Sequence, residues 1–165
     1  MGDYLDLANQ AKRTEEERAA GKAAQPEIAH ELVVSALKTN LYKVQQFVTS
    51  HLENLNCSMK TKMQFDLIVE ELFVNISLYA YELKNGEAKI RFGYDEDTDM
   101  AAVTFIDSGM PYDPLAKEDP DVTLPSAQRA IGGLGIFMCK KLADEMSYEY
   151  KDGQNILTVK KKLHS

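Results

Sequence analysis

The chain has 165 residues, 44% of them hydrophobic and 27% charged, which is typical of one soluble globular domain. Its formal net charge of −7 argues against non-specific binding of DNA or RNA, which needs a basic surface. The sequence has neither an apolar signal core nor a run long enough to span a bilayer, so we expect a cytoplasmic protein with no membrane contact.

The first half of the chain predicts an extension, a strand and two helices. Residues 1–27 are rich in alanine and charge, and we expect them to form a helical or disordered extension before a domain over residues 28–163. Residues 28–37 predict the first strand of that domain. A stripe of apolar residues predicts a helix over residues 39–55, and a broader apolar face predicts a long helix over residues 59–83.

The second half changes to the period of a strand. Apolar residues alternate over residues 88–94 and 101–105, which predicts a hairpin. Residues 108–131 hold four prolines and little periodicity, so we expect a functional loop such as a lid. A helix over residues 135–145 and two strands joined at Asp152-Gly153 close the chain. This order predicts an α+β fold, a two-layer α/β sandwich with helices on one face of a mixed β-sheet.

The first candidate motif pairs Glu71 with Asn75 in the long predicted helix. Side chains four residues apart lie on one helical face. The Asn oxygen suits Mg²⁺, which needs few protein ligands when phosphates supply the others, and the carboxylate one turn away suits a general base. The same spacing is common on solvated helices, so the pair alone leaves both interpretations open.

The second motif, DSGMPYDP, follows directly after an apolar strand. Asp107 can accept a hydrogen bond from the exocyclic amine of a base, and Gly109 allows a flat ring to lie close to the backbone. The alternative is a turn that simply ends the strand, because Asp, Ser, Gly and Pro are common in turns.

The third motif is a cluster of glycines, Gly132, Gly133 and Gly135, where a helix is expected to begin. A glycine-rich loop entering a helix leaves backbone N–H groups unpaired, and phosphate oxygens can satisfy them with help from the helix dipole. The alternatives are a flexible hinge or a tight contact between a helix and a strand. The segment is neither a dinucleotide fingerprint nor a P-loop, because GxGxxG and GK[ST] are both missing.

Taken in order, these motifs resemble the GHKL ATPase superfamily: ExxxN on a long helix, DxGxP after a strand, a lid, and GGLGI opening a helix. The segments DSGMPYDP, RAIGGLGIFMCKKLADEMSYEY and DGQNILTVKKKL resemble its anti-sigma factor serine/threonine kinases, a branch with a histidine kinase-like ATPase domain. The resemblance covers residues 28–163 and implies the Bergerat fold, with ATP and Mg²⁺ as cofactors.

The resemblance also implies a role for each matching position. Glu71 would be the general base for a serine or threonine hydroxyl, and Asn75 would hold Mg²⁺ against the phosphates. Asp107 would read the adenine amine, with Gly109 beneath the ring. For Arg129, a phosphate contact and an ordinary solvated position are equally open. The other ATP-binding positions are expected at Tyr79, Pro111, Gly132, Gly133, Leu134 and Gly135.

Two positions depart from the family pattern. Ile76 stands where the family commonly has alanine, and Tyr79 where it commonly has histidine or a basic residue. Ile76 can reshape the pocket, while Tyr79 can donate through its hydroxyl but supplies no charge. None of the three histidines is expected to be catalytic, and the two cysteines predict no structural zinc.

The resemblance implies a protein kinase that phosphorylates an anti-anti-sigma protein with a STAS domain and also binds and regulates a sigma factor. A homodimer is a further expected assembly. The alternative is a nucleotide-gated protein-binding module with little or no kinase activity, which would keep the pocket but need no general base. A small-molecule enzyme has no support beyond the pocket itself.

Overall fold

The computed structural model describes residues 30–82, 84–116, 118–121, 123 and 133–164. The extension expected over residues 1–27 lies outside this part of the chain, as do Arg129 and Gly132. The expected boundary of the domain at residue 28 therefore stays a prediction.

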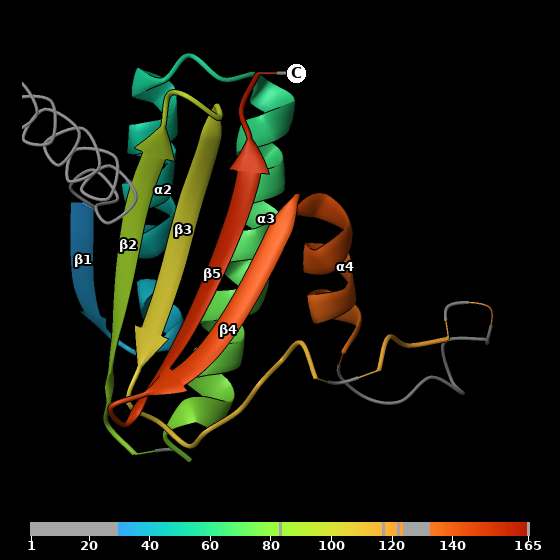
Figure 1. Cartoon of the computed structure of the whole chain (residues 1–165). Coiled ribbons are helices and arrows are strands. Elements are labelled where there is room, and N and C mark those ends of the chain that lie inside the picture. The colour runs from blue at the N-terminus through green and yellow to red at the C-terminus, as the bar shows by residue number, and fades with distance from the viewer. Residues whose placement is uncertain (1–29, 83, 117, 122, 124–132, 165) are drawn as a thin grey trace, which may run out of the picture.

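Five strands form one sheet, and helices cover one of its faces (Figure 1). In Figure 1, α2 and α3 lie behind the sheet, and α4 lies beside β4. The fold is thus the expected two-layer α+β sandwich. The elements are β1 (His30–Ser35), η1 (Lys38–Asn40), α2 (Leu41–Asn54), α3 (Met59–Asn75), η2 (Ile76–Ala80), β2 (Glu87–Asp95), β3 (Met100–Asp107), α4 (Leu134–Leu142), β4 (Glu145–Lys151) and β5 (Gln154–Lys162).

The sheet is antiparallel at every pairing of the described strands, so the expectation of a mixed sheet was wrong. Its strand order is β1-β2-β3-β5-β4. Helices α2 and α3, which lie between β1 and β2 in the chain, run in opposite directions. Strand β2 therefore starts near the end of β1 and is antiparallel to it (Figure 1). The single helix α4 gives β4 the same direction as β3, but β5 lies between these two strands and is antiparallel to both.

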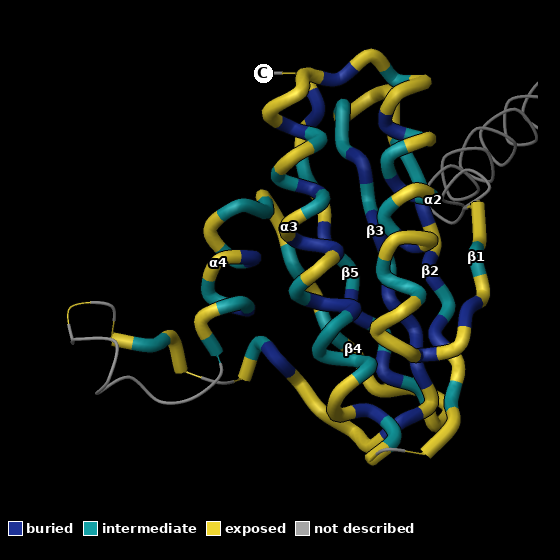
Figure 2. The backbone as a smooth tube through the Cα atoms, turned by 180° about the vertical axis from the view of Figure 1, so that it is seen from behind, coloured by how far each residue is buried: buried dark blue, intermediate teal, exposed yellow. Residues whose placement is uncertain are grey.

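The alternation predicted from the sequence defines the core. The predicted inward positions of β2 and β3 are buried except for Tyr94, which is half-buried, and β5 adds three more buried positions to this face. Figure 2, seen from the helical side, shows buried segments along the strands behind α2 and α3. The buried inward residues are Ala88, Ile90, Phe92, Ala101, Val103, Phe105, Asn155, Leu157 and Val159.

The long helix expected over residues 59–83 ends earlier. The α-helical hydrogen bonding of α3 stops at Asn75, and the π-helical turn η2 follows over Ile76–Ala80. The carbonyl of Ala80 accepts a hydrogen bond from the backbone of Met110, at 2.9 Å, rather than continuing the helix. Single π-helical turns often occur at functional sites, and this one lies beside the loop after β3.

The last helix also differs from the expectation of residues 135–145. Helix α4 ends at Leu142, because Ala143 is extended and Asp144 donates its backbone N–H to Lys160 of β5. Glu145 consequently begins β4. No helix of the described residues combines the length and apolar character that crossing a membrane requires.

An ion pair connects the end of the chain to the hairpin of β2 and β3. His164 Nδ1 lies 2.8 Å from Asp99 Oδ1, and the His164 backbone N–H donates to Asp99 Oδ2. The hydrogen bond to Asp99 raises the pKa of His164 above its usual 6.5, and the same bond lowers the pKa of Asp99 below its usual 3.8. The protonated histidine and the ionised carboxylate are therefore both favoured in the folded state.

We expect Phe65→Ala to reduce the free energy of unfolding by about 3–5 kcal/mol, because Phe65 of α3 is fully buried in the hydrophobic core and its loss leaves a cavity. Met63→Ala is the matched control on the same helix, since Met63 is 60% exposed and should change stability by no more than about 0.5 kcal/mol. Urea unfolding of both variants measures the difference. Equal losses would contradict this account of the core.

We expect His164→Ala to reduce stability more at about pH 5 than at about pH 8. A pKa raised by folding contributes stability below 6.5, and this contribution is lost as pH rises through the raised pKa of His164. On the acid side, the contribution of Asp99 is lost as pH falls through its lowered pKa. Urea unfolding at both pH values measures the effect, and an equal loss at the two would rule out the ion pair as its cause.

Candidate functional site

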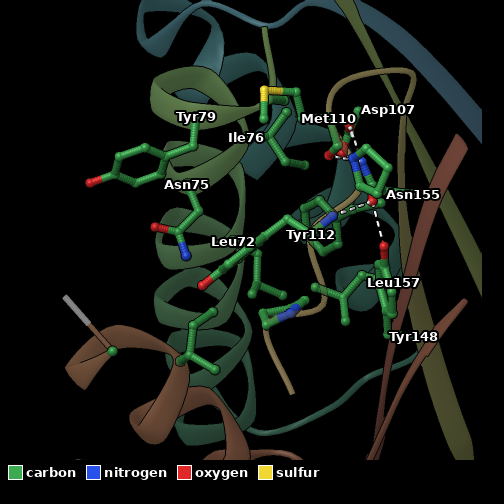
Figure 3. A pocket seen from close by; sticks show the side chains of 16 residues that line it. Leu72, Asn75, Ile76, Tyr79, Asp107, Met110, Tyr112, Tyr148, Asn155 and Leu157 are labelled. Atoms are coloured by element: carbon green, nitrogen blue, oxygen red, sulfur yellow. Dashed lines mark hydrogen bonds between the residues drawn. The ribbon is translucent and has the colours of Figure 1, made fainter. Parts of the chain in front are cut away.

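A cavity of about 470 Å³ lies between the end of α3 and the sheet (Figure 3). Its walls come from α3, η2, β3, the loop after β3, Gly133, α4, β4 and β5. Most of the side chains that line it are apolar or aromatic, as in cavities that hold small ligands. The lining residues are Leu72, Asn75, Ile76, Tyr79, Ala80, Phe105, Asp107, Met110, Pro111, Tyr112, Pro114, Gly133, Ile136, Tyr148, Asn155 and Leu157.

Asp107, the last residue of β3, places its carboxylate at one end of this cavity (Figure 3). It is only 6% exposed, and its Oδ1 accepts hydrogen bonds from Gly109 N and Asn155 Nδ2, both at 2.9 Å. Within the described part of the chain, Oδ2 accepts no hydrogen bond. This second oxygen remains available to a ligand that carries an N–H donor.

Gly109 does not line the cavity, although it was expected beneath a bound ring. A Cβ at this position would overlap the carbonyl of Ala80 in η2. Glycine is thus needed here because the loop after β3 packs directly on the backbone of the π-helical turn. The predicted proline of the same motif, Pro111, does line the cavity.

Asn155 is the polar cavity residue that the sequence analysis missed. It stands opposite Asp107 in the register of β3 and β5, and it is only 7% exposed. Its Nδ2 also donates to Met110 O, and its Oδ1 accepts from Tyr112 N and from the hydroxyl of Tyr148. The signal for it was an asparagine in phase with the apolar positions of an alternating strand, because a buried amide needs partners.

The end of α3 supplies another wall of the cavity. The half-buried side chain of Asn75 lines it, and among the described residues its amide has no hydrogen-bond partner. Ile76 also lines the cavity, at the position where the sequence departs from the family pattern. Tyr79 lies at the mouth and is 64% exposed, and Figure 3 shows its ring directed away from Asp107 and Asn155.

Glu71 lies one turn before Asn75, outside the cavity wall and against the first turn of α4. A Cβ added at Gly135 would overlap Glu71 Oε2, so the close approach of α3 and α4 depends on this glycine.

The pKa of the Cys139 thiol is raised to about 12, mainly by burial and secondly by the nearby Glu71 carboxylate. This cysteine is therefore a neutral core residue.

The start of α4 lies at the other end of the cavity. Gly133 is the N-cap and has a φ of 91°, a left-handed conformation that favours glycine. Among the described residues no side chain caps this helix, so its first backbone N–H groups keep their capacity to bind an anion. Leu134 begins the helix and is 43% exposed, but neither it nor Gly135 lines the cavity.

These residues fit a nucleotide with Mg²⁺. The cavity has a buried carboxylate at one end and an uncapped helix start at the other, and Asn75 offers a free amide oxygen beside it. The described residues hold no group of three or more His, Cys, Asp and Glu that could bind a metal ion by themselves. A single amide oxygen from the protein suits Mg²⁺, which commonly takes most of its ligands from phosphates and water.

Comparison with known proteins agrees with this geometry. The model of the histidine kinase-like ATPase domain matches residues 34–161, which is more than half of the chain. No curated protein shows a significant match to the sequence. The matched residues include the end of α3, the end of β3, the start of α4 and both C-terminal strands, so every wall of the cavity belongs to the matched region. The chain belongs to the histidine kinase-like ATPase domain family, whose members bind ATP.

Proposed function

We propose that this chain is an ATP-dependent serine/threonine protein kinase that phosphorylates an anti-anti-sigma protein with a STAS domain and regulates a sigma factor. The position of Glu71 carries this proposal, because its carboxylate lies against Gly135 at the start of α4, one turn before Asn75. A module that only binds nucleotide has no need of a carboxylate there.

In this proposal the cavity orients ATP between two different ends. The adenine amine donates to Asp107 Oδ2, while the phosphates extend toward Gly133 and the N–H groups that begin α4. Asn75 would hold Mg²⁺, which neutralises phosphate charge when bound. Pro111 and Tyr79 flank the mouth, and Arg129 and Gly132 belong to the proposed phosphate side from the sequence alone.

The proposed reaction is an in-line transfer to a serine or threonine hydroxyl. The hydroxyl oxygen forms a bond to the γ-phosphorus as the bond from that phosphorus to the β-phosphate oxygen breaks, which releases ADP. Glu71 accepts the hydroxyl proton as general base. The N–H groups at the start of α4 stabilise the negative charge on the phosphates.

The proposed partners are proteins. The net charge of −7 disfavours nucleic acid and leaves room for a basic surface on a protein partner. The partners that we propose are a sigma factor and a STAS-domain protein. We further propose a cytoplasmic protein, with a homodimer as its assembly and no direct contact with nucleic acid or membrane.

A nucleotide-gated binding module is the second candidate, and Ile76 and Tyr79 favour it. Ile76 narrows the cavity where the family commonly has alanine, and the exposed Tyr79 supplies no positive charge for phosphate. Phosphotransfer from labelled ATP to a STAS-domain protein of the same genome separates the two candidates. Transfer supports the kinase, whereas ATP binding without transfer to any such protein supports the module.

We expect Asp107→Asn to weaken ATP binding by about ten-fold or more. Two N–H donors hold Oδ1, so the oxygen of the new amide would stay there and its NH₂ group would face the NH₂ group of adenine. Titration calorimetry with ATP and Mg²⁺ measures the affinity. Asp95→Asn, in the hairpin at the far end of β2, is the control and should bind ATP as the wild type does. Unchanged affinity in Asp107→Asn would contradict the assignment.

We expect Glu71→Gln to lower the rate of phosphotransfer by roughly a hundred- to ten-thousand-fold while ATP binding changes little, because only the proton acceptor is lost. Asn75→Ala should instead weaken both ATP binding and transfer. Glu70→Gln is the matched control, since Glu70 is exposed on the neighbouring position of α3. Full transfer by a folded Glu71→Gln protein would refute the proposed mechanism.

A further inference from the structure

Both N–H donors and both acceptor positions of the Asn155 amide are hydrogen-bonded. The partners lie on β3, on the loop after β3 and on β4, three parts of the cavity wall. We propose that Asn155 is a positioning residue that holds the Asp107 carboxylate as an acceptor for the base, and so makes the site prefer a 6-aminopurine over a 6-oxopurine. This inference rests on the proposed function, in which Asp107 reads the adenine amine.

Two backbone groups fix which way the Asn155 amide points. The N–H of Tyr112 can only donate, so the atom 3.0 Å from it must be the amide oxygen. The carbonyl of Met110 can only accept, so the atom 2.9 Å from it must be the amide nitrogen. With this orientation the second N–H of Asn155 faces Asp107 Oδ1, also at 2.9 Å.

Tyr148 of β4 reinforces this orientation. Its hydroxyl donates a hydrogen bond to Asn155 Oδ1, because an amide oxygen can only accept. Burial raises the pKa of Tyr148, which keeps the hydroxyl protonated and able to donate. An amide flip would lose hydrogen bonds at both ends, because donors would then face donors and acceptors would face acceptors.

The two oxygens of Asp107 therefore have different hydrogen-bond partners. Oδ1 accepts from Gly109 N and Asn155 Nδ2, and these two N–H donors fix the orientation of the carboxylate. Oδ2 accepts no hydrogen bond from the described residues and is left as the acceptor for the base. An amino group at position 6 of a purine can donate to this oxygen, whereas an oxo group there would bring two acceptors together.

The selectivity between ATP and ITP tests this role directly. Asn155→Leu removes both N–H donors at nearly the same volume, so the Asp107 carboxylate loses one of the two donors that fix its orientation and can rotate out of the position in which Oδ2 selects an amino group. We expect the ratio of ATP to ITP affinity, from calorimetry with Mg²⁺, to fall by about ten-fold. Gln154→Leu is the matched control on β5, and it should leave the ratio unchanged because Gln154 makes no hydrogen bond to Asp107.

A purely structural role makes a different prediction. If Asn155→Leu weakened ATP and ITP by the same factor, the positioning role would be overturned. Should this variant not fold, Tyr148→Phe gives the answer, because it removes one of the two donors that orient the amide. We expect it to lower the ATP to ITP ratio by about two- to five-fold, and an unchanged ratio would overturn the role.

The same titrations separate this inference from the proposed function. A wild type that binds ATP and ITP equally would overturn both. If Asp107→Asn lowered the ratio while a folded Asn155→Leu protein kept it, the reading of adenine by Asp107 would stand and only the positioning role of Asn155 would fall.

Discussion

The buried carboxylate of Asp107 is the constraint on which the rest of the site depends. A carboxylate in a mostly apolar cavity is costly unless hydrogen-bond donors surround it, and here they come from Gly109 and Asn155. The first donor requires a tight turn directly after β3. The second requires β5 to lie next to β3 in the register that sets Asn155 opposite Asp107. The strand order of the sheet thus determines which hydrogen-bond donor lies next to the Asp107 carboxylate.

Two glycines then bring the helical layer close enough to complete the cavity. Gly109 lets the loop after β3 pack on the Ala80 carbonyl of η2, and Gly135 lets α4 pack on the Glu71 carboxylate of α3. A side chain at either position would push backbone or carboxylate away. The glycine cluster therefore serves two purposes, since Gly133 adopts a left-handed conformation at the helix start while Gly135 provides space for Glu71.

The sequence was sufficient to predict the parts of the fold that depend on local periodicity. The alternation of residues 88–94 and 101–105 predicted β2, β3 and their buried faces, and Asp152-Gly153 predicted the last hairpin. The antiparallel pairing of β5 between β3 and β4 could not be predicted, because it depends on which strands become neighbours in space. The π-helical turn was not predicted either, and the hydrogen bond of its last residue, Ala80, to the backbone of Met110 forms only when segments distant in the sequence become neighbours.

The two ends of the cavity differ in how many hydrogen bonds fix their polar side chains. At the Asp107 end, Asp107 and Asn155 are buried and hydrogen bonds connect them across β3, β4 and β5, so the acceptor proposed for the base is in place before a ligand binds. At the other end, the half-buried Asn75 has no partner among the described residues, and Glu71 rests on the first turn of α4. Any shift of α4 would change the surroundings of the Glu71 carboxylate together with the position of the helix start, to which the proposal assigns the phosphates. In the proposed function, residues of the sheet therefore recognise the base, whereas the position of the proposed catalytic group depends on where one short helix lies.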